Sequence, residues 1–198
     1  PMLEILLERC IASGFKHFYL SVNYLKEQII DYFQNGERWG VSIKYLVEDR
    51  PLGTAGSLQL LPNGMQEPFL VLNGDVLTLF NPFHLLRFHN GQNADATLCV
   101  RDHVVNIPFG VVKTKDMELI EFEEKPSYHN LINAGLYVIN PQLLPLLPLN
   151  QKTDMPTLLE IARQAGHRVS VCPIHEDWID VGRPESLKDA DKTCWDSK

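Results

Sequence analysis

Asp75 is the residue that the sequence alone places best for chemistry. It follows Phe69–Leu72, four apolar residues without a charge, with Asn73 and Gly74 in between. Such a run predicts a strand buried on both faces, as in a parallel sheet. In open α/β sheets, ligands bind beyond the carboxyl ends of the strands, so Asp75 falls where a ligand would lie. Its carboxylate is the hard oxygen ligand that Mg²⁺ prefers, and Gly74 permits close approach to the backbone.

Asp75 also has a purely structural interpretation, because an aspartate after a strand often begins a turn or caps a helix. Further motifs favour the functional one. They follow in order along the chain: Arg50–Gly56, Glu123–Pro126, Asn133–Val138 and Trp178–Pro184. Together with Asn73–Asp75, this set resembles the sugar-1-phosphate nucleotidyltransferases, also called nucleotide-sugar pyrophosphorylases. The amino-acid sequence at 51–56 and the helix start at 154–156 are most similar to the mannose-1-phosphate guanylyltransferase-like branch.

The resemblance implies a reaction between a nucleoside triphosphate, with GTP favoured, and a sugar-1-phosphate. The products would be a nucleotide-diphosphate sugar, as used in polysaccharide biosynthesis, and pyrophosphate. Two aspartates, Asp75 and Asp180, match the positions that hold one Mg²⁺ in the family, and Lys125 matches the third catalytic position. For Asp180 alone, capping a helix that begins at Pro184 is the structural alternative.

The resemblance also assigns the substrate contacts. On the nucleotide side, Glu48 would reach a base edge, and the backbone of a glycine-bearing turn would hold the base; this group is Glu48, Pro51, Gly53, Thr54, Gly74 and Asp75. On the sugar side, Lys125 would act as a point charge on the phosphate, and the other contacts would go to the sugar itself. That second group is Gly110, Glu124, Lys125 and Asn133. Gly110 also has a structural interpretation, as a bend in a strand.

One family feature has no counterpart before Pro1. Family members begin with a strand and a loop rich in Gly, Thr, Arg and Leu, whereas this chain starts with the helix-like segment Met2–Arg9. Proline suits the first turn of a helix, where its missing N–H is not needed. We therefore expect an N-terminally truncated domain that lacks the triphosphate-wrapping loop. Such a fragment would be inactive as a transferase, and its absent strand would leave two inner sheet edges unpaired.

Composition sets limits on partners and location. The 198 residues carry a net charge of −7, which argues against nucleic acid as a partner. The apolar runs are too short to span a membrane and no signal peptide is visible, so we expect a cytoplasmic protein; a homo-oligomer is left open. The four cysteines contain no Cys-x-x-Cys pair and predict reduced, mostly buried thiols. The seven histidines show no metal-ligand spacing, and His84 and His89 are expected at the surface.

The order of elements predicts the fold class. Up to residue 92, helical and strand-like patterns alternate, which predicts a doubly wound, mostly parallel, Rossmann-like α/β sheet. From residue 93 on, strands follow one another with little helix between them, which predicts an antiparallel or mixed extension that carries the sugar. We expect a single nucleotidyltransferase domain over 1–198, with a nucleotide-binding half (1–92) and a sugar-phosphate-binding half (93–198). Helices are expected at 2–13, 24–34, 54–61, 82–89, 155–165 and 184–195. The predicted strands include 42–47 and 178–180.

Two other functions remain as alternatives. A non-catalytic, nucleotidyltransferase-like regulatory or scaffold domain would tend to lose the acidic and lysine positions, yet Asp75, Lys125 and Asp180 are all present. A glycosyltransferase on a similar sheet would use an Asp-x-Asp metal motif, whereas Asn73–Asp75 contains one aspartate. The sequence therefore favours an enzyme, and it does not identify the base or the sugar.

Overall fold

The computed structural model describes residues 1–182. Its first part alternates helices and strands: α1 (Met2–Ala12), β1 (His17–Val22), α2 (Lys26–Phe33), the 3-10 turn η1 (Glu37–Trp39) and β2 (Ser42–Val47). β1 and β2 pair in parallel over their whole length. Leu7, Phe33 and Ile43 from α1, α2 and β2 form a small core against them. The predicted βαβ pattern is confirmed here.

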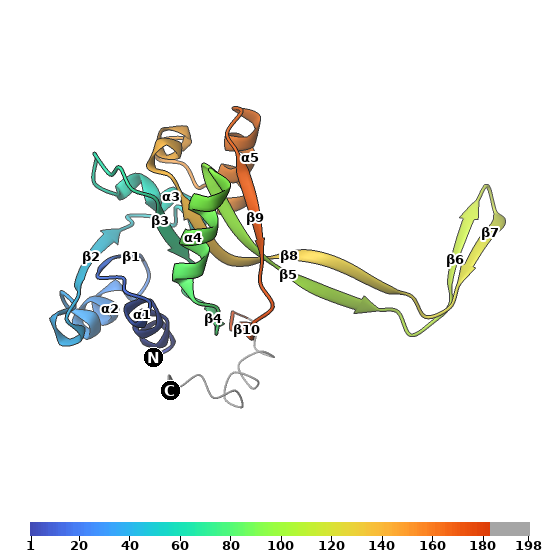
Figure 1. Ribbon diagram of the computed structural model, residues 1–198, viewed down its shortest axis with the longest axis horizontal. Coiled ribbons are helices and arrows are strands. Elements are labelled where there is room, and N and C mark those ends of the chain that lie inside the picture. The colour runs from blue at the N-terminus through green and yellow to red at the C-terminus, as the bar shows by residue number, and fades with distance from the viewer. Residues whose placement is uncertain (183–198) are drawn as a thin grey trace.

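A four-stranded mixed sheet forms the centre of the molecule (Figure 1). Its order is β3 (Phe69–Leu72), β8 (Ser127–Ile139), β5 (Ala96–Asn106) and β9 (Val169–Pro173). β8 runs antiparallel to both of its neighbours, and β9 is parallel to β5. This sheet is separate from the β1–β2 pair.

Helices cover both faces of the central sheet. One face packs on α3 (Gly53–Gly56), η2 (Ser57–Leu60), η3 (Pro141–Leu146) and α5 (Met155–Gln164). The other packs on α4 (Pro82–Gln92). Along β8, Tyr137 and Ile139 join the first core while Leu136 and Val138 join the second, as the two-residue period of a strand requires. The predicted α/β, Rossmann-like fold with a mixed extension is confirmed.

The prediction for Phe69–Leu72 was wrong in its details. This segment is a strand, but it pairs antiparallel with β8, and its four residues are half-buried rather than buried on both faces. An apolar run indicates a buried environment without specifying the direction of the neighbouring strand. The neighbour that decides it, β8, lies more than fifty residues further along the chain.

A long two-stranded arm projects from the body (Figure 1). Beyond the sheet, Arg101–Asn106 of β5 continue to pair with Ser127–Ile132 of β8. The far end of the arm carries the hairpin of β6 (Val111–Lys115) and β7 (Glu118–Glu123). The arm exposes large apolar side chains, among them Phe109, Leu119, Ile120, Phe122 and Leu131. It is therefore the part of the described chain with the least support from a core.

The thiols agree with the sequence and one histidine does not. Cys10, Cys99 and Cys172 are buried and free, whereas Cys194 lies outside the described residues, as does the helix expected at 184–195. Burial raises the pKa of the Cys10 thiol to about 12, which keeps it protonated. The expectation of surface histidines was wrong for His89, which is 1% exposed because α4 presses it against the sheet. Within residues 1–182, no helix is long and apolar enough to cross a membrane.

Candidate functional site

Asp75 and Asp180 lie side by side because of a short strand pair that the sequence did not reveal. β4 (Val76–Thr78) pairs antiparallel with β10 (Trp178–Asp180), with Asp180 opposite Val76. The backbone N–H of Val181 donates to the Asp75 carbonyl at 2.8 Å. Asp75 ends the turn before β4, and Asp180 is the last residue of β10, so the two carboxylates meet at one end of the pair.

Gly182 shows how closely the two carboxylates converge. A Cβ atom built on this glycine would lie 3.1 Å from Asp180 Oδ1 and 3.1 Å from Asp75 Oδ2. Both oxygens therefore face the same small volume, and only a residue without a side chain leaves it open. The Gly182 N–H donates to Asp180 Oδ1 at 3.0 Å, which fixes that carboxylate. The predicted metal pair, Asp75 and Asp180, is thus brought together.

A bulge in β8, flanked by Asn133, lies next to the Asp75–Asp180 pair, which is called the metal corner below for its proposed role. The Asn133 side chain accepts the N–H of Gly135 at 3.0 Å and donates to the Tyr137 hydroxyl at 2.7 Å. The Gly135 carbonyl in turn accepts the N–H of Asn73 at 2.9 Å. Asn133 lies next to the turn that presents Asp75. Its side-chain amide holds the bulge through these hydrogen bonds, although the residue as a whole is exposed.

The residues predicted for the nucleotide form a second group with local partners of their own. Glu48 accepts the Leu52 N–H at 2.7 Å through Oε2 and the Ser21 hydroxyl through Oε1, so its carboxylate braces the loop that contains Pro51. Pro51 itself is exposed. These bonds give Glu48 a structural role in this conformation, and its role toward a base stays a prediction.

Gly53 and Thr54 connect α3 to the start of α5. Thr54 donates its backbone N–H to Asp154 Oδ1 at 3.1 Å, and its hydroxyl accepts the Met155 N–H at 2.8 Å. Gly53 has φ of 79°, and a Cβ there would lie 2.7 Å from the Thr153 carbonyl. Glycine at 53 is therefore required by this close approach. The predicted helix start at Asp154 is confirmed as the N-cap position of α5.

The residues predicted for the sugar lie on the arm, apart from Asn133. Lys125 and Glu124 follow β7 and are each 68% exposed in their side chains, with Lys125 Nζ 3.9 Å from Glu124 Oε1. A Cβ on Gly110 would clash with the Phe122 ring and lie 3.1 Å from Glu124 Oε2, so Gly110 and Glu124 are neighbours. Figure 1 shows this tip well away from β4 and β10. The structure therefore groups Gly110, Glu124 and Lys125 with one another and separates them from the two carboxylates, whereas Asn133 lies close to the turn that presents Asp75.

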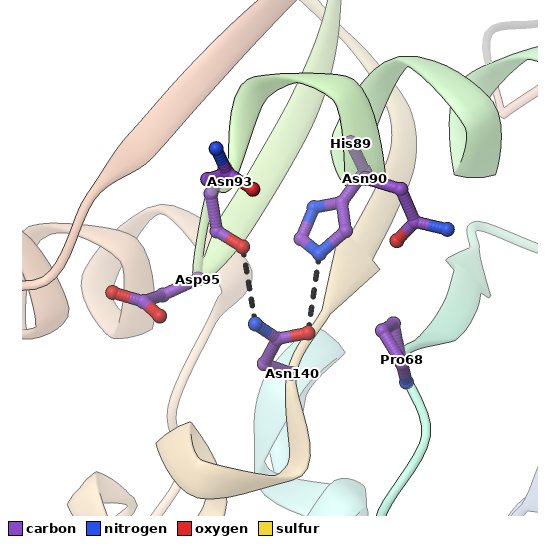
Figure 2. A pocket seen from close by; sticks show the side chains of 7 residues that line it. Pro68, His89, Asn90, Asn93, Asp95 and Asn140 are labelled. Atoms are coloured by element: carbon purple, nitrogen blue, oxygen red, sulfur yellow. Dashed lines mark hydrogen bonds between the residues drawn. The ribbon is translucent and has the colours of Figure 1, made fainter.

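A polar hollow of about 310 Å³ lies elsewhere, between α4 and the start of β5. Figure 2 shows His89 and Asn140 at its centre, with His89 Nε2 3.1 Å from Asn140 Oδ1. Asn140 Nδ2 donates to the Ala94 carbonyl, so its oxygen is free to accept and His89 Nε2 is the protonated ring nitrogen. Pro68 of this hollow precedes β3 whereas Asp75 follows it, so the two sites lie at opposite ends of that strand. These hydrogen bonds give His89 a structural role.

Comparison with known proteins identifies the family. The nucleotidyl transferase family model matches residues 1–197. This chain belongs to the nucleotidyl transferase family. The resemblance on which the sequence analysis rested is confirmed by this match.

Two relatives by sequence are named as mannose-1-phosphate guanylyltransferases. The chain is 34% identical over 199 residues to a mannose-1-phosphate guanyltransferase of Yarrowia lipolytica, which covers 94% of this chain and 53% of that protein. It is 32% identical over 194 residues to mannose-1-phosphate guanylyltransferase 1 of Arabidopsis thaliana, covering 93% and 53%. The chain thus spans about half the length of the curated relatives it matches.

Solved structures support the fold. A Bacillus anthracis protein assigned as a glucose-1-phosphate thymidylyltransferase, solved in complex with sucrose, superposes with a TM-score of 0.74 at 20% identity, covering 100% of this chain and 84% of that one. HddC from Yersinia pseudotuberculosis, solved with GMP-PN, gives 0.72 at 20% identity, covering 97% and 84%. At this identity the comparison establishes a shared fold.

Sequence reasoning missed the residues that assemble the corner. Trp178 was predicted as part of a motif and of a short strand, but the hydrogen bond from its indole N–H to the Ala134 carbonyl, at 2.8 Å, was not predicted. Val76–Thr78 was not expected as a strand. The apolar residues at 76 and 77, directly after the Asn73–Asp75 turn, were the available signal for a short second strand.

Proposed function

We propose that this chain is the catalytic part of a sugar-1-phosphate nucleotidyltransferase. The observation that carries the proposal is the convergence of Asp75 and Asp180 on the space left by Gly182. Two carboxylates within reach of one point, at the end of a strand pair, suit a divalent cation that is shared with phosphate oxygens. Membership of the nucleotidyl transferase family and the names of the relatives support this function.

The reaction we propose needs alignment and charge neutralisation more than proton transfer. An oxygen of the sugar-1-phosphate forms a new bond to the α-phosphorus of the triphosphate, and the bond from that phosphorus to the bridging oxygen of the leaving group breaks. Pyrophosphate leaves with the electron pair. Because the attacking phosphate is already an anion, no side chain has to remove a proton.

The carboxylate pair fits Mg²⁺ by its chemistry and its spacing. Both donors are hard oxygens, and the volume beside Gly182 is open. In residues 1–182 there is no cluster of three or more potential protein ligands, which agrees with an ion that keeps water and phosphate oxygens as its other ligands. When bound, the ion would neutralise charge on the phosphates. The chain's own contribution is to hold Asp75 and Asp180 in one geometry through the β4–β10 pair.

The sugar would be recognised from the arm. Lys125 supplies a positive charge for the sugar phosphate, and Glu124 and Asn133 supply hydrogen-bonding groups for hydroxyls. In the described conformation the arm tip is remote from the carboxylates (Figure 1). Catalysis therefore requires the arm to bend toward β4, with β8 as its pivot. Because the relatives are named as mannose-1-phosphate guanylyltransferases, we propose GTP and mannose-1-phosphate as the substrates, and the cytoplasm remains the predicted location.

The test is a screen of the complete protein for pyrophosphate release across nucleoside triphosphates and sugar-1-phosphates, with Mg²⁺. We expect release to be fastest with GTP and mannose-1-phosphate, and to vanish in Asp75→Asn and Asp180→Asn proteins that retain the native circular dichroism spectrum. Absence of release with every substrate pair would contradict the proposal and would favour the non-catalytic alternative.

A further inference from the structure

The junction between arm and body is an irregularity in β8. Where β5 advances two residues, from Leu98 to Val100, its partner on β8 changes by four, from Tyr137 to Asn133. The residues of β8 between these two partners, 134–136, form a bulge, and Gly135 in its middle has φ of 75°. A bulge bends a strand and re-aims the side chains around it. The direction of the arm and the position of Asn133 are both set here.

Two hydrogen bonds hold the bulge, one from each side of the candidate site. Asn73, in the turn that presents Asp75, donates its N–H to the Gly135 carbonyl at 2.9 Å. Trp178, two residues before Asp180, donates its indole N–H to the Ala134 carbonyl at 2.8 Å. The bulge is thus the common anchor of both carboxylate-bearing segments.

Trp178 is also held by a core cluster and by Arg101. It packs with a core cluster that includes Val76, Ala134 and Leu136. The Arg101 guanidinium lies 5.9 Å from the ring centroid, and its Nη1 donates to the Trp178 carbonyl at 3.2 Å. Arg101 is where β5 leaves the body for the arm, so the same indole contacts the first residue of the arm.

We propose that Trp178 is a positioning residue of the transfer reaction. Its indole N–H fixes the bulge against β10, so that the carboxylates and the base of the sugar-binding arm keep one relative geometry. The side chain touches no substrate and acts through Ala134, Asp180 and Asn133. This inference rests on the proposed function, and it makes Trp178 the point where the metal corner and the sugar arm are coupled.

The direct test is Trp178→Phe in the complete protein, because phenylalanine keeps an aromatic ring and removes the N–H donor. Leaving a buried acceptor without its donor typically changes the equilibrium constant between the ordered and the open arrangement by about ten-fold. We expect KM for the sugar-1-phosphate to rise and kcat to fall, each by about ten-fold, with KM for the triphosphate changed less than about two-fold. A purely structural role would lower only the active fraction, so that kcat falls while both KM values stay the same, and that result would overturn the inference.

A second measurement does not depend on activity. In Trp178→Phe, amide hydrogen exchange at Asn73 should accelerate by about ten-fold, since its acceptor lies on the bulge. Exchange at Ser42, whose N–H donates to the Lys16 carbonyl in the other sheet, should be unchanged. If the wild-type protein releases no pyrophosphate, the proposed function fails, whereas unchanged exchange at Asn73 would refute the role of Trp178 itself.

Two further variants complete the design. Trp39→Phe is the matched control, because Trp39 belongs to the core beside β1 and β2, and the same substitution there should alter neither KM nor Asn73 exchange. Arg101→Lys keeps a positive charge and removes the planar guanidinium beside the indole. It should shift the sugar-phosphate KM in the same direction as Trp178→Phe and by a smaller factor. An opposite shift, or no shift, would exclude Arg101 from the coupling.

Discussion

The two halves of the candidate site differ in how firmly the fold holds them. Asp75 and Asp180 sit on a strand pair whose backbone bonds tie both to the body. Glu124 and Lys125 sit at the tip of a two-stranded arm, each 68% exposed. A two-stranded hairpin is at best marginally stable without something packed against it. If the proposed function is correct, the two carboxylates are already held in place by the fold, whereas the tip proposed to bind the sugar would reach them only after the arm bends.

The largest effect is expected at the preorganised end. Asp75→Asn removes one of the two converging carboxylates and preserves size and shape, so Mg²⁺-dependent turnover should fall by about a hundred-fold or more while the unfolding temperature stays unchanged. Pyrophosphate release at saturating substrates measures it. Asp116→Asn, in the β6–β7 turn, is the control, since asparagine tolerates the positive φ of 49° found there. Near-normal turnover in Asp75→Asn would remove the metal corner from the mechanism.

A somewhat smaller effect is expected at the arm tip. Lys125→Ala removes the positive charge proposed for the sugar phosphate, so both KM for that substrate and kcat should worsen, by roughly ten- to a hundred-fold in kcat/KM. KM for the triphosphate should stay the same. Lys115→Ala, a lysine of the same hairpin, should have no effect. If Lys125→Ala changed only the affinity for the triphosphate, the assignment of the arm to the sugar would be incorrect.

Glu124→Ala sharpens the same assignment. A carboxylate can accept hydrogen bonds from two hydroxyls. Its loss should therefore reduce the ratio of kcat/KM values between the preferred and a disfavoured sugar-1-phosphate by about ten-fold, and turnover of the best substrate should be less affected. The ratio of kcat/KM values for two epimeric sugar-1-phosphates is the measurement. An unchanged ratio would show that Glu124 does not read the sugar.

The junction between the two regions is tested by Gly135→Ala. A Cβ at this position would lie 3.0 Å from Asn73 Nδ2 and 3.0 Å from Val76 Cγ2, in addition to the strain of φ 75°. We expect a loss of about 2–3 kcal/mol in the free energy of unfolding, measured by urea denaturation. Gly166→Ala has a similar φ of 88° and open space around it, so it should lose only about 1 kcal/mol. Equal losses would mean that the bulge is not tightly packed.

The smallest expected effect is on stability, and it distinguishes two aspartate–histidine pairs. Asp95 and His167 form one in the body, and Asp102 and His129 form the other on the arm. Burial tends to raise the pKa of Asp95, but hydrogen bonds from the Arg168 N–H and the His167 ring outweigh it, and the pKa lies below its usual value. A lowered carboxylate pKa stabilises the fold above the unfolded pKa, near 4, and this stabilisation is lost as pH falls through the folded pKa.

Asp95→Asn should therefore lower the free energy of unfolding at pH 7 by less than about 1 kcal/mol, and the difference from wild type should shrink below pH 4. Denaturation curves at pH 7 and pH 3 measure it. On the arm, Asp102 contacts His129 at 2.8 Å with 45% of its side chain exposed, so Asp102→Asn should change stability less. A larger loss for Asp102 would mean that the arm is better supported than its exposure indicates.

Local sequence determined most of the elements. Ser42–Val47 and Trp178–Asp180 have the predicted bounds as strands, and Met155–Gln164 begins where Asp154 and Pro156 predicted a helix start. These features depend on neighbours within a few residues: strand alternation, an N-cap and a proline in the first turn. The order of the motifs also sufficed to identify the family.

Which of these elements meet depends on contacts between segments that are far apart in the sequence. Asp75 and Asp180 are 105 positions apart in the chain, and they are joined by the pairing of β10 with β4, a three-residue strand that was not predicted from the sequence. The direction of β3 depended on β8, and the separation of Lys125 from the carboxylates depended on how far β5 and β8 continue to pair beyond the central sheet. Pairing between distant strands is set by packing and by backbone hydrogen bonds, and neither is written in any local stretch of sequence.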